Sequence, residues 1–146
     1  MSKRVVVTGI GIISSLGLVV ASTWQGIVNS RSGVDYITLF DAGEFGVKIA
    51  AEVKGFDPCQ YIDRKRARRM DRFTQFAIAA SLEASESARL KIDRSNGYDV
   101  GVIIGSCMGG LTTLSGQFEV LASDGPSQVG PFLIPMMLAD MASGQV

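Results

Sequence analysis

The chain has 146 residues, of which 47% are apolar and 19% charged, so it can form a domain with a core and is too apolar for a disordered tail. Its 14 basic residues balance its 14 acidic ones, which excludes a whole-molecule field that would attract nucleic acid or a membrane surface. It has no histidine and only two cysteines, which excludes a Ser-His-Asp triad, a disulfide framework and a four-cysteine metal site within these residues, and favours a reducing cytoplasm.

The first predicted unit is a strand, a loop and a helix. Residues 4–8 are a β-branched run closed by a glycine, which predicts a buried parallel strand that ends in a tight turn. Ser22 is followed three residues later by Gln25, so we predict a capping box that opens a helix at Ser22 and carries it to about Ser30. Residues 47–53 alternate weakly between apolar and polar side chains and predict a second strand.

The longest helical pattern follows Asp63, which is predicted to cap it. Apolar residues recur at helical spacing from Met70 to about Leu90. Residues 100–104 are the clearest candidate for a buried strand, and a glycine-rich loop and a helix over 111–121 follow them. This alternation of strands and helices predicts a layered α/β fold with a largely parallel sheet.

Charge is distributed unevenly along the chain. Residues 1–94 hold all 14 basic residues, whereas residues 95–146 hold four acidic residues and no basic one. A stretch with so little charge is expected to be buried against other polypeptide, so we interpret residues 1–146 as one part of a larger α/β domain, with no second domain. Residues 5–30 also carry no charge, but glycines and serines interrupt the apolar run, and we expect neither a membrane span nor an export signal.

Two glycine loops resemble nucleotide-binding motifs without completing them. Residues 9–11 begin like the dinucleotide fingerprint, but Ser14 stands where the third glycine is required. Gly105 and Gly110 have the spacing of a phosphate loop, but Leu111 stands where that loop has its lysine. We interpret both loops as tight turns and expect no nucleotide cofactor and no metal site.

Cys107 lies between Gly105 and Gly109 in the arrangement of a nucleophile elbow, after a predicted strand and before a predicted helix. A thiol needs a nearby base or positive charge to become a nucleophilic thiolate. The chain has no histidine and no basic residue after Arg94. We therefore interpret Cys107 as a small apolar residue, and a cysteine hydrolase is the weaker alternative.

A basic cluster lies at the start of the long helical pattern. It holds six of the 14 basic residues within residues 64–72. Positive charge at a helix start opposes the helix dipole, so the cluster should slightly destabilise the helix. A function of these charges could explain why they lie there. A docking patch for a phosphate-bearing or acidic partner and a solvated helix face fit the cluster about equally well. Nucleic acid fits poorly with the balanced net charge.

Several short stretches, taken in order along the whole chain, point to one family. They are residues 4–11 with Ser15-Leu16-Gly17, Ser22-Thr23-Trp24, Phe40-Asp41, Arg68-Arg69-Met70-Asp71, Gly105-Ser106 with Gly109-Gly110, and Pro131-Phe132-Leu133-Ile134-Pro135. Together they resemble the N-terminal part of the β-ketoacyl-acyl carrier protein synthases, and most of all the type II condensing enzymes of fatty-acid synthesis. An ordered set of this kind is far more specific than any one stretch.

The resemblance implies a thiolase-like fold, an α-β-α-β-α layered sandwich of two similar halves, of which this chain would form most of the first half. It also implies an acyltransferase that passes an acyl group from carrier protein to a cysteine, decarboxylates malonyl-carrier protein and condenses the two into a 3-oxoacyl product. In that family the cysteine and two histidines lie in later motifs, so we expect no catalytic residue in this chain. No cofactor is expected either, because phosphopantetheine arrives on the carrier protein.

Carried over residue by residue, the resemblance gives Lys65, Arg68 and Arg69 a docking role, because they match basic positions that meet the acidic carrier protein and its phosphate. This raises the docking interpretation above the solvated face. The implied partners are acyl carrier protein, acyl and malonyl thioesters and a second copy of the chain, with no nucleic acid and no membrane. A carrier-protein-binding module without chemistry is the alternative function.

The resemblance also places an acyl pocket. Met108 matches an apolar residue at the pocket floor, and its flexible thioether could admit acyl chains of varied length. Leu133 and Ile134 match the segment that reaches the pocket of the partner subunit. Cys107 departs from the small glycine usual at its position, which changes the expected shape of the pocket beside it.

Overall fold

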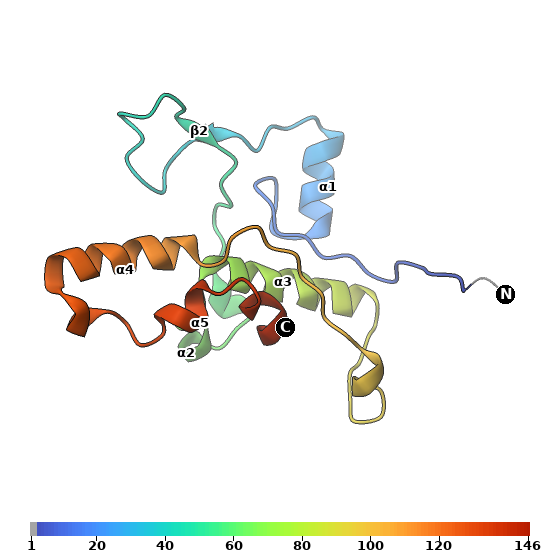
Figure 1. The fold of residues 1–146 in the computed structure, drawn as a ribbon. Coiled ribbons are helices and arrows are strands. Elements are labelled where there is room, and N and C mark those ends of the chain that lie inside the picture. The colour runs from blue at the N-terminus through green and yellow to red at the C-terminus, as the bar shows by residue number, and fades with distance from the viewer. Residues whose placement is uncertain (1–2) are drawn as a thin grey trace. The chain divides into compact units, whose positions relative to one another are not determined.

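The computed structural model describes residues 3–146, and the contacts divide them into two units (Figure 1). The first unit runs up to Asp57 and takes in residues 83–90. The second unit contains residues 58–82 and 91–146. Within the described residues no helix is both long enough and apolar enough to cross a membrane.

Helix α1 (Val20–Val28) of the first unit begins two residues before the predicted start. The predicted N-cap at Ser22 is therefore wrong, because Ser22 occupies the third position of the helix. Its hydroxyl donates to the carbonyl of Val19 at 3.1 Å and accepts from the N–H of Val19 at 3.4 Å. The helix ends at Asn29, and Ser30 follows with a φ of 51°.

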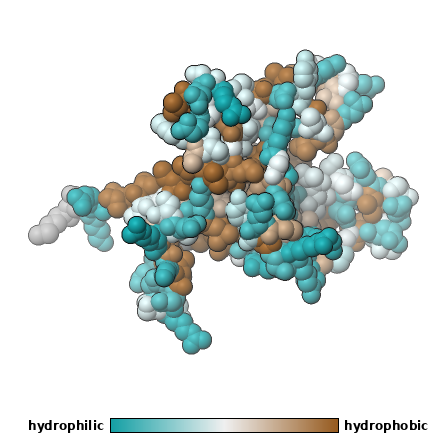
Figure 2. Space-filling model, turned by 180° about the vertical axis from the view of Figure 1, so that it is seen from behind, coloured by the Kyte–Doolittle hydropathy of each residue, from teal (hydrophilic) through white to brown (hydrophobic). Residues whose placement is uncertain are grey.

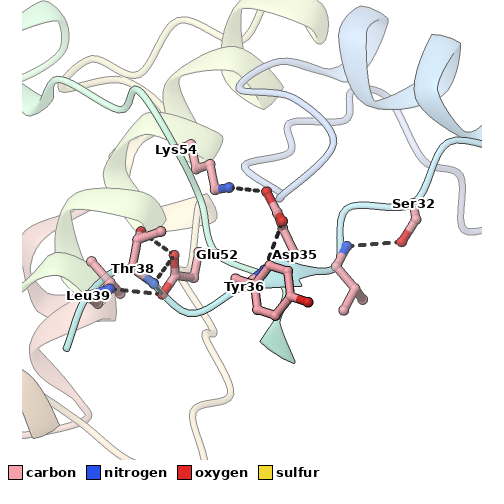
Figure 3. Close-up of polar contacts among 8 residues, drawn as sticks. Ser32, Asp35, Tyr36, Thr38, Leu39, Glu52 and Lys54 are labelled. Atoms are coloured by element: carbon pink, nitrogen blue, oxygen red, sulfur yellow. Dashed lines mark hydrogen bonds and ion pairs between the residues drawn. The ribbon is translucent and has the colours of Figure 1, made fainter. Parts of the chain in front are cut away.

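The only strands among the described residues are β1 (Asp35–Tyr36) and β2 (Ile49–Ala50), which pair antiparallel. The strand predicted over 47–53 is thus confirmed only at its centre. Two residues after β2, the buried carboxylate of Glu52 accepts hydrogen bonds from the N–H of Thr38 at 3.0 Å, its hydroxyl at 2.6 Å and the N–H of Leu39 at 3.2 Å (Figure 3). The carboxylate thus supplies acceptors that a longer ladder would otherwise provide.

Three ionised groups, Asp35, Glu52 and Lys54, lie on or next to this short pair. Lys54 Nζ lies 2.6 Å from Oδ2 of Asp35, and this contact lowers the pKa of the Asp35 carboxyl and raises the pKa of the Lys54 ammonium (Figure 3). The pKa of Glu52 is also below its ordinary value, first because the Thr38 hydroxyl donates to it and then because the Thr38 N–H does. Each of these contacts thus favours the charged form of its group.

Two strand predictions are wrong for the described chain. Residues 4–8 of the first unit and residues 100–104 of the second adopt no paired strand. Val5 is 91% exposed and Ile103 is 99% exposed. The β-branched pattern encodes an extended backbone, but a strand exists only when a neighbouring strand takes up its N–H and C=O groups, and none of the described residues does so.

The core of the second unit is small and lies around the predicted helical region. It consists of Ile62, Ala67, Met70 and Ile78, with Tyr61 packed against it. A 3₁₀ turn, η1 (Pro58–Gln60), leads into it. The predicted cap is confirmed, because Oδ1 of Asp63 accepts from the N–H of Lys65 at 2.9 Å and the N–H of Arg66 at 3.2 Å.

The long helix predicted from Asp63 to Leu90 is in fact two helices, α2 (Arg64–Ala67) and α3 (Arg72–Ser87). The helix is interrupted at residues 68–71. A new helix begins after Asp71, whose carboxylate accepts a hydrogen bond from the N–H of Phe73 at 3.3 Å. An aspartate competes for the backbone N–H groups of the next turn, which favours a new helix start over a continuous helix.

The remaining helices of the second unit follow residues 100–110, which form neither a helix nor a strand. Helix α4 (Leu111–Asp124) confirms the helix predicted over 111–121. The 3₁₀ turn η2 (Gly97–Asp99) precedes it in the chain, and the 3₁₀ turn η3 (Pro126–Gln128) and the short helices α5 (Leu133–Met137) and α6 (Met141–Gln145) follow it. The side-chain amide oxygen of Gln117 accepts from the N–H of Gly130 at 2.5 Å, which joins the 125–131 loop to α4.

Candidate functional site

A surface cleft of about 510 Å³ lies in the second unit, and we call it the basic cleft. Its lining residues are Asp63, Arg64, Lys65, Arg68, Arg69 and Phe132. The three residues predicted to dock a partner, Lys65, Arg68 and Arg69, therefore all face one space. All three are exposed, so their charged groups remain available to a ligand.

The break between α2 and α3 shapes the basic cleft. Asp63 caps α2 and places a carboxylate beside the positive charges that oppose the helix dipole. Arg68 caps the C-terminus of α2, and Arg69 lies between α2 and α3. The directions of their side chains therefore differ from those in a continuous α-helix. The arrangement gathers four cations beside one carboxylate, which suits a ligand with several negative charges.

Two other basic residues of the cluster are used within the unit. The guanidinium of Arg66 donates to the side-chain oxygen of Gln145 at 3.4 Å. The guanidinium carbon of Arg72 lies 4.8 Å from the ring centroid of Phe76. Neither residue lines the basic cleft. The cluster is thus divided into a part that faces the cleft and a part that packs elsewhere.

Phe132 is a cleft residue that the sequence analysis missed. The guanidinium carbon of Arg69 lies 4.5 Å from the centroid of its ring, within the range of a cation–π contact. The only sequence signal was its place in the Pro131-Phe132-Leu133-Ile134-Pro135 stretch, because its distance from Arg69 along the chain hides the contact. The ring holds the guanidinium and provides an apolar wall to the cleft.

The three predicted acyl-pocket residues do not form one pocket in the described chain. Leu133 lines a small apolar cavity of about 60 Å³ with Leu114, Gln117, Phe118, Leu121 and Val129. Met108 and Ile134 do not line this cavity, and their exposed fractions are 60% and 58%. An acyl pocket that uses all three needs further polypeptide around them.

The glycine loop, residues 105–110, is shaped by close packing. A Cβ atom at Gly109 would collide with the backbone of Met137 and Ala139, and one at Gly110 with the carbonyl of Met136. The N–H of Gly110 donates to the carbonyl of Met137 at 3.0 Å. These two glycines therefore serve the approach of the 136–139 backbone, as expected for a turn.

Cys107 and Cys59 are exposed thiols. No histidine is present, and no basic residue follows Arg94, so nothing in the sequence around Cys107 supplies an activating base. In the part of the chain that the structure describes, no three histidine, cysteine, aspartate or glutamate side chains gather as metal ligands.

Comparison with known proteins assigns the chain to a family. Residues 2–146 match the family model described as the N-terminal domain of beta-ketoacyl synthase. The chain belongs to the β-ketoacyl synthase family. The family suggested by the ordered sequence stretches is thus confirmed over the whole chain.

Two curated relatives of this ketosynthase chain are both called 3-oxoacyl-[acyl-carrier-protein] synthase 2. The protein from Synechocystis sp. is 48% identical over 97% of this chain and 34% of its own length. The protein from Staphylococcus aureus is 44% identical over 99% of this chain and 35% of its own length. The chain therefore spans about a third of the length of these ketosynthases.

A solved ketosynthase structure settles the fold. The ishigamide ketosynthase/chain length factor superposes with a TM-score of 0.80 at 32% identity, over 96% of this chain and 35% of its own. The predicted thiolase-like fold is confirmed by this likeness, and the chain corresponds to the N-terminal part of it.

Proposed function

We propose that the chain is the N-terminal third of an elongating 3-oxoacyl-[acyl-carrier-protein] synthase of fatty-acid synthesis. Two relatives named 3-oxoacyl-[acyl-carrier-protein] synthase 2 are 48% and 44% identical to it over the aligned residues, and this supports the proposal. In this reaction an acyl group moves from a carrier thioester to a cysteine thiol. Malonyl-carrier protein then loses CO₂, and the resulting carbanion attacks the acyl group and releases the thiol.

The observation that carries the proposal is the basic cleft. Lys65, Arg68 and Arg69 line it together, as a docking site for an acidic carrier protein requires. Guanidinium groups bind phosphate and carboxylate through paired hydrogen bonds, so they suit both the carrier surface and the phosphate of its phosphopantetheine arm. The arm brings the reactive thiol, and the protein needs no cofactor of its own.

Other parts of the proposal concern the pocket and the assembly. Met108 forms the floor of the acyl pocket, and Leu133 and Ile134 reach the pocket of a second copy in a homodimer. Met108 and Ile134 are exposed and so are available for such contacts, whereas Leu133 is only partly exposed. The exposed thiols of Cys59 and Cys107 suit a reducing compartment such as the cytoplasm.

The docking role is tested by charge reversal. Lys65→Glu, Arg68→Glu and Arg69→Glu together should weaken binding of holo-acyl carrier protein by about tenfold at low salt, and by less as salt rises. Fluorescence anisotropy of labelled carrier protein measures the affinity. Arg66→Glu is the matched control, because it reverses a charge of the same cluster outside the cleft. Equal affinity of the triple variant and the unchanged protein at low salt would return the cluster to a solvated face.

A carrier-protein-binding module without chemistry is the second candidate, because the basic cleft accounts for docking and not for condensation. Product formation separates the candidates. The 146-residue chain alone should form no 3-oxoacyl product from acyl- and malonyl-carrier protein under either one. The same chain joined to the remaining two thirds of the Synechocystis relative should form 3-oxoacyl product if the chain is part of a condensing enzyme. It should form none if the chain is only a binding module.

A further inference from the structure

Asp71 is a buried carboxylate, 6% exposed, to which neither the docking role nor the pocket assigns a task. It lies in the second unit between the starts of two helices. Oδ1 accepts from the N–H of Phe73 in α3 at 3.3 Å. Oδ2 accepts from the N–H of Thr113 in α4 at 2.9 Å and from the Thr113 hydroxyl at 2.6 Å.

One carboxylate thus serves two helix starts. Each helix start presents unpaired N–H groups and a partial positive charge, and both favour an anion. A buried carboxylate is stable only when its oxygens are hydrogen-bonded, so the contacts of Asp71 with both helices stabilise one another. The carboxylate therefore fixes the first turn of α4 relative to the first turn of α3.

The glycine loop is held in the same place. A Cβ atom at Gly110 would lie 2.9 Å from both Cβ and Oδ2 of Asp71, so the loop backbone passes directly against this side chain. The loop is also held by the hydrogen bond from the N–H of Gly110 to the carbonyl of Met137. Met108 lies two residues before Gly110, so the position of its backbone follows from this clamp.

The basic cleft is linked to Asp71 along the chain. Arg69 precedes Asp71 by two residues, and its guanidinium stacks on Phe132, the residue directly before Leu133. The residues proposed to meet the carrier protein and those proposed to meet the acyl chain are therefore linked in two ways, by the contacts of Asp71 with Thr113 and Gly110 and by the contact of Arg69 with Phe132. In each link one or two residues of chain complete the connection.

We propose that Asp71 is a positioning residue that fixes the glycine loop, and with it Met108, relative to the basic cleft. What binds at the cleft and the loop rests on the proposed function; the clamp itself rests on the contacts of Asp71. Loss of the carboxylate should free the loop and let the pocket floor shift while the basic residues stay in place.

Hydrogen exchange measures the clamp without any substrate. In the 146-residue chain, Asp71→Asn should speed amide exchange in peptides covering residues 105–114 by about tenfold, because one oxygen becomes an N–H₂ donor facing N–H groups. Thr113→Val keeps the shape and the backbone N–H of Thr113, so it should speed exchange less. The double variant should match Asp71→Asn alone, because both changes remove one shared interaction.

Glu52→Gln is the matched control, because Glu52 is also a buried carboxylate with three donors but belongs to the first unit. It should leave exchange in 105–114 unchanged. The clamp would be overturned if residues 105–114 exchanged at the wild-type rate in both Asp71→Asn and Thr113→Val. It would also be overturned if Glu52→Gln accelerated exchange there as much as Asp71→Asn does. Should Asp71→Asn fail to fold, Thr113→Val against Glu52→Gln still decides it.

The acyl chain-length profile separates positioning from general stability. The profile compares the condensation rates of one sample with acyl chains of different length. Partial unfolding lowers all of these rates by the same factor and so leaves the profile unchanged. In the chain joined to the remainder of the Synechocystis relative, Asp71→Asn should change the profile, while Thr113→Ser and Glu52→Gln should keep it. Faster exchange with an unchanged profile would overturn the positioning role. A joined protein without condensing activity would overturn the proposed function alone, because the exchange comparison still decides the clamp.

Discussion

Glu52, Asp71 and Glu83 each accept hydrogen bonds from backbone N–H groups of a distant segment. Glu52 serves Thr38 and Leu39, and Asp71 serves two helix starts. Glu83 completes the pattern in the first unit, where its two oxygens accept from the N–H of Ile12 at 2.9 Å and of Val20 at 2.8 Å. Each one satisfies donors that neither a helix nor a sheet ladder reaches.

Glu52 gives this pattern a pH dependence. Its pKa in the folded chain lies below its ordinary value of 4.5, so its stabilising effect is present above that pH and is lost as pH falls through the lowered pKa. We predict that the melting temperature of the wild type falls more steeply between about pH 5 and pH 3 than that of Glu52→Gln, which cannot ionise.

Circular dichroism melts across this pH range measure the effect. Glu52→Gln should melt lower than the wild type near pH 7, and the two melting temperatures should approach one another in acid. Glu44→Gln removes an exposed carboxylate of the same unit and is the control, with a pH profile like the wild type. Parallel profiles of Glu52→Gln and the wild type would show that the Thr38 contacts have no effect on stability.

Met108 carries the second prediction for a single side chain. If it forms the pocket floor, Met108→Phe should shorten the acyl chains that the joined ketosynthase accepts, because a rigid ring fills space that the flexible thioether leaves open. Rates with acyl-carrier proteins of graded length measure the profile. Met108→Leu is close in volume and should keep the wild-type profile. An unaltered profile in Met108→Phe would remove Met108 from the pocket.

At the scale of elements, two glycines near α4 should respond to alanine in opposite directions. A Cβ at Gly109 meets the backbone of Met137 and Ala139, so Gly109→Ala should lower the free energy of unfolding by about 1–3 kcal/mol. Gly116 lies inside α4 with open space around it, so Gly116→Ala should raise that free energy by about 1 kcal/mol. Urea denaturation measures both, and a stable Gly109→Ala would contradict the close packing of the loop.

Sequence predictions succeeded where neighbouring residues determine the structure and failed where residues distant in the sequence determine it. Helix α4 and the cap at Asp63 are decided by neighbouring residues, and both are confirmed. The predicted strands at 4–8 and 100–104 depend on distant partners, so their pattern gave only an extended backbone. The break before α3 was missed because the apolar spacing continues through it, while the carboxylate of Asp71 decides it.

The same distinction holds for the site. The cluster at Lys65, Arg68 and Arg69 is contiguous and could be read directly from the sequence. Phe132 joins it through a contact between distant segments, and Thr113 joins Asp71 in the same way. Neither contact has a periodicity or spacing that could reveal it. The family resemblance gave roles to Arg69 and to Leu133, which follows Phe132, but it gave none to Phe132 itself.

At the scale of the whole molecule, the most apolar extended segments are left uncovered. Figure 2 shows hydrophobic atoms in brown along the segment that follows the grey N-terminal residues. Val5 and Val7 in the first unit and Ile103 in the second are among the most exposed apolar side chains. Unpaired β-branched segments of this kind readily pair with other chains. The ketosynthase relatives are about three times as long, so they contain polypeptide that could cover them.

The last prediction concerns this uncovered surface. The 146-residue chain alone should bind a hydrophobic dye strongly and self-associate, and replacing Val5, Val7 and Ile103 by threonine should reduce both effects with little change in stability. The same three replacements in the chain joined to the rest of the Synechocystis relative should instead lower its melting temperature, because the new hydroxyls would be buried between strands. Dye fluorescence, sedimentation and thermal melts measure these effects. A 146-residue chain that stays monomeric, melts cooperatively and binds no dye would mean that these segments need no further strands to cover them.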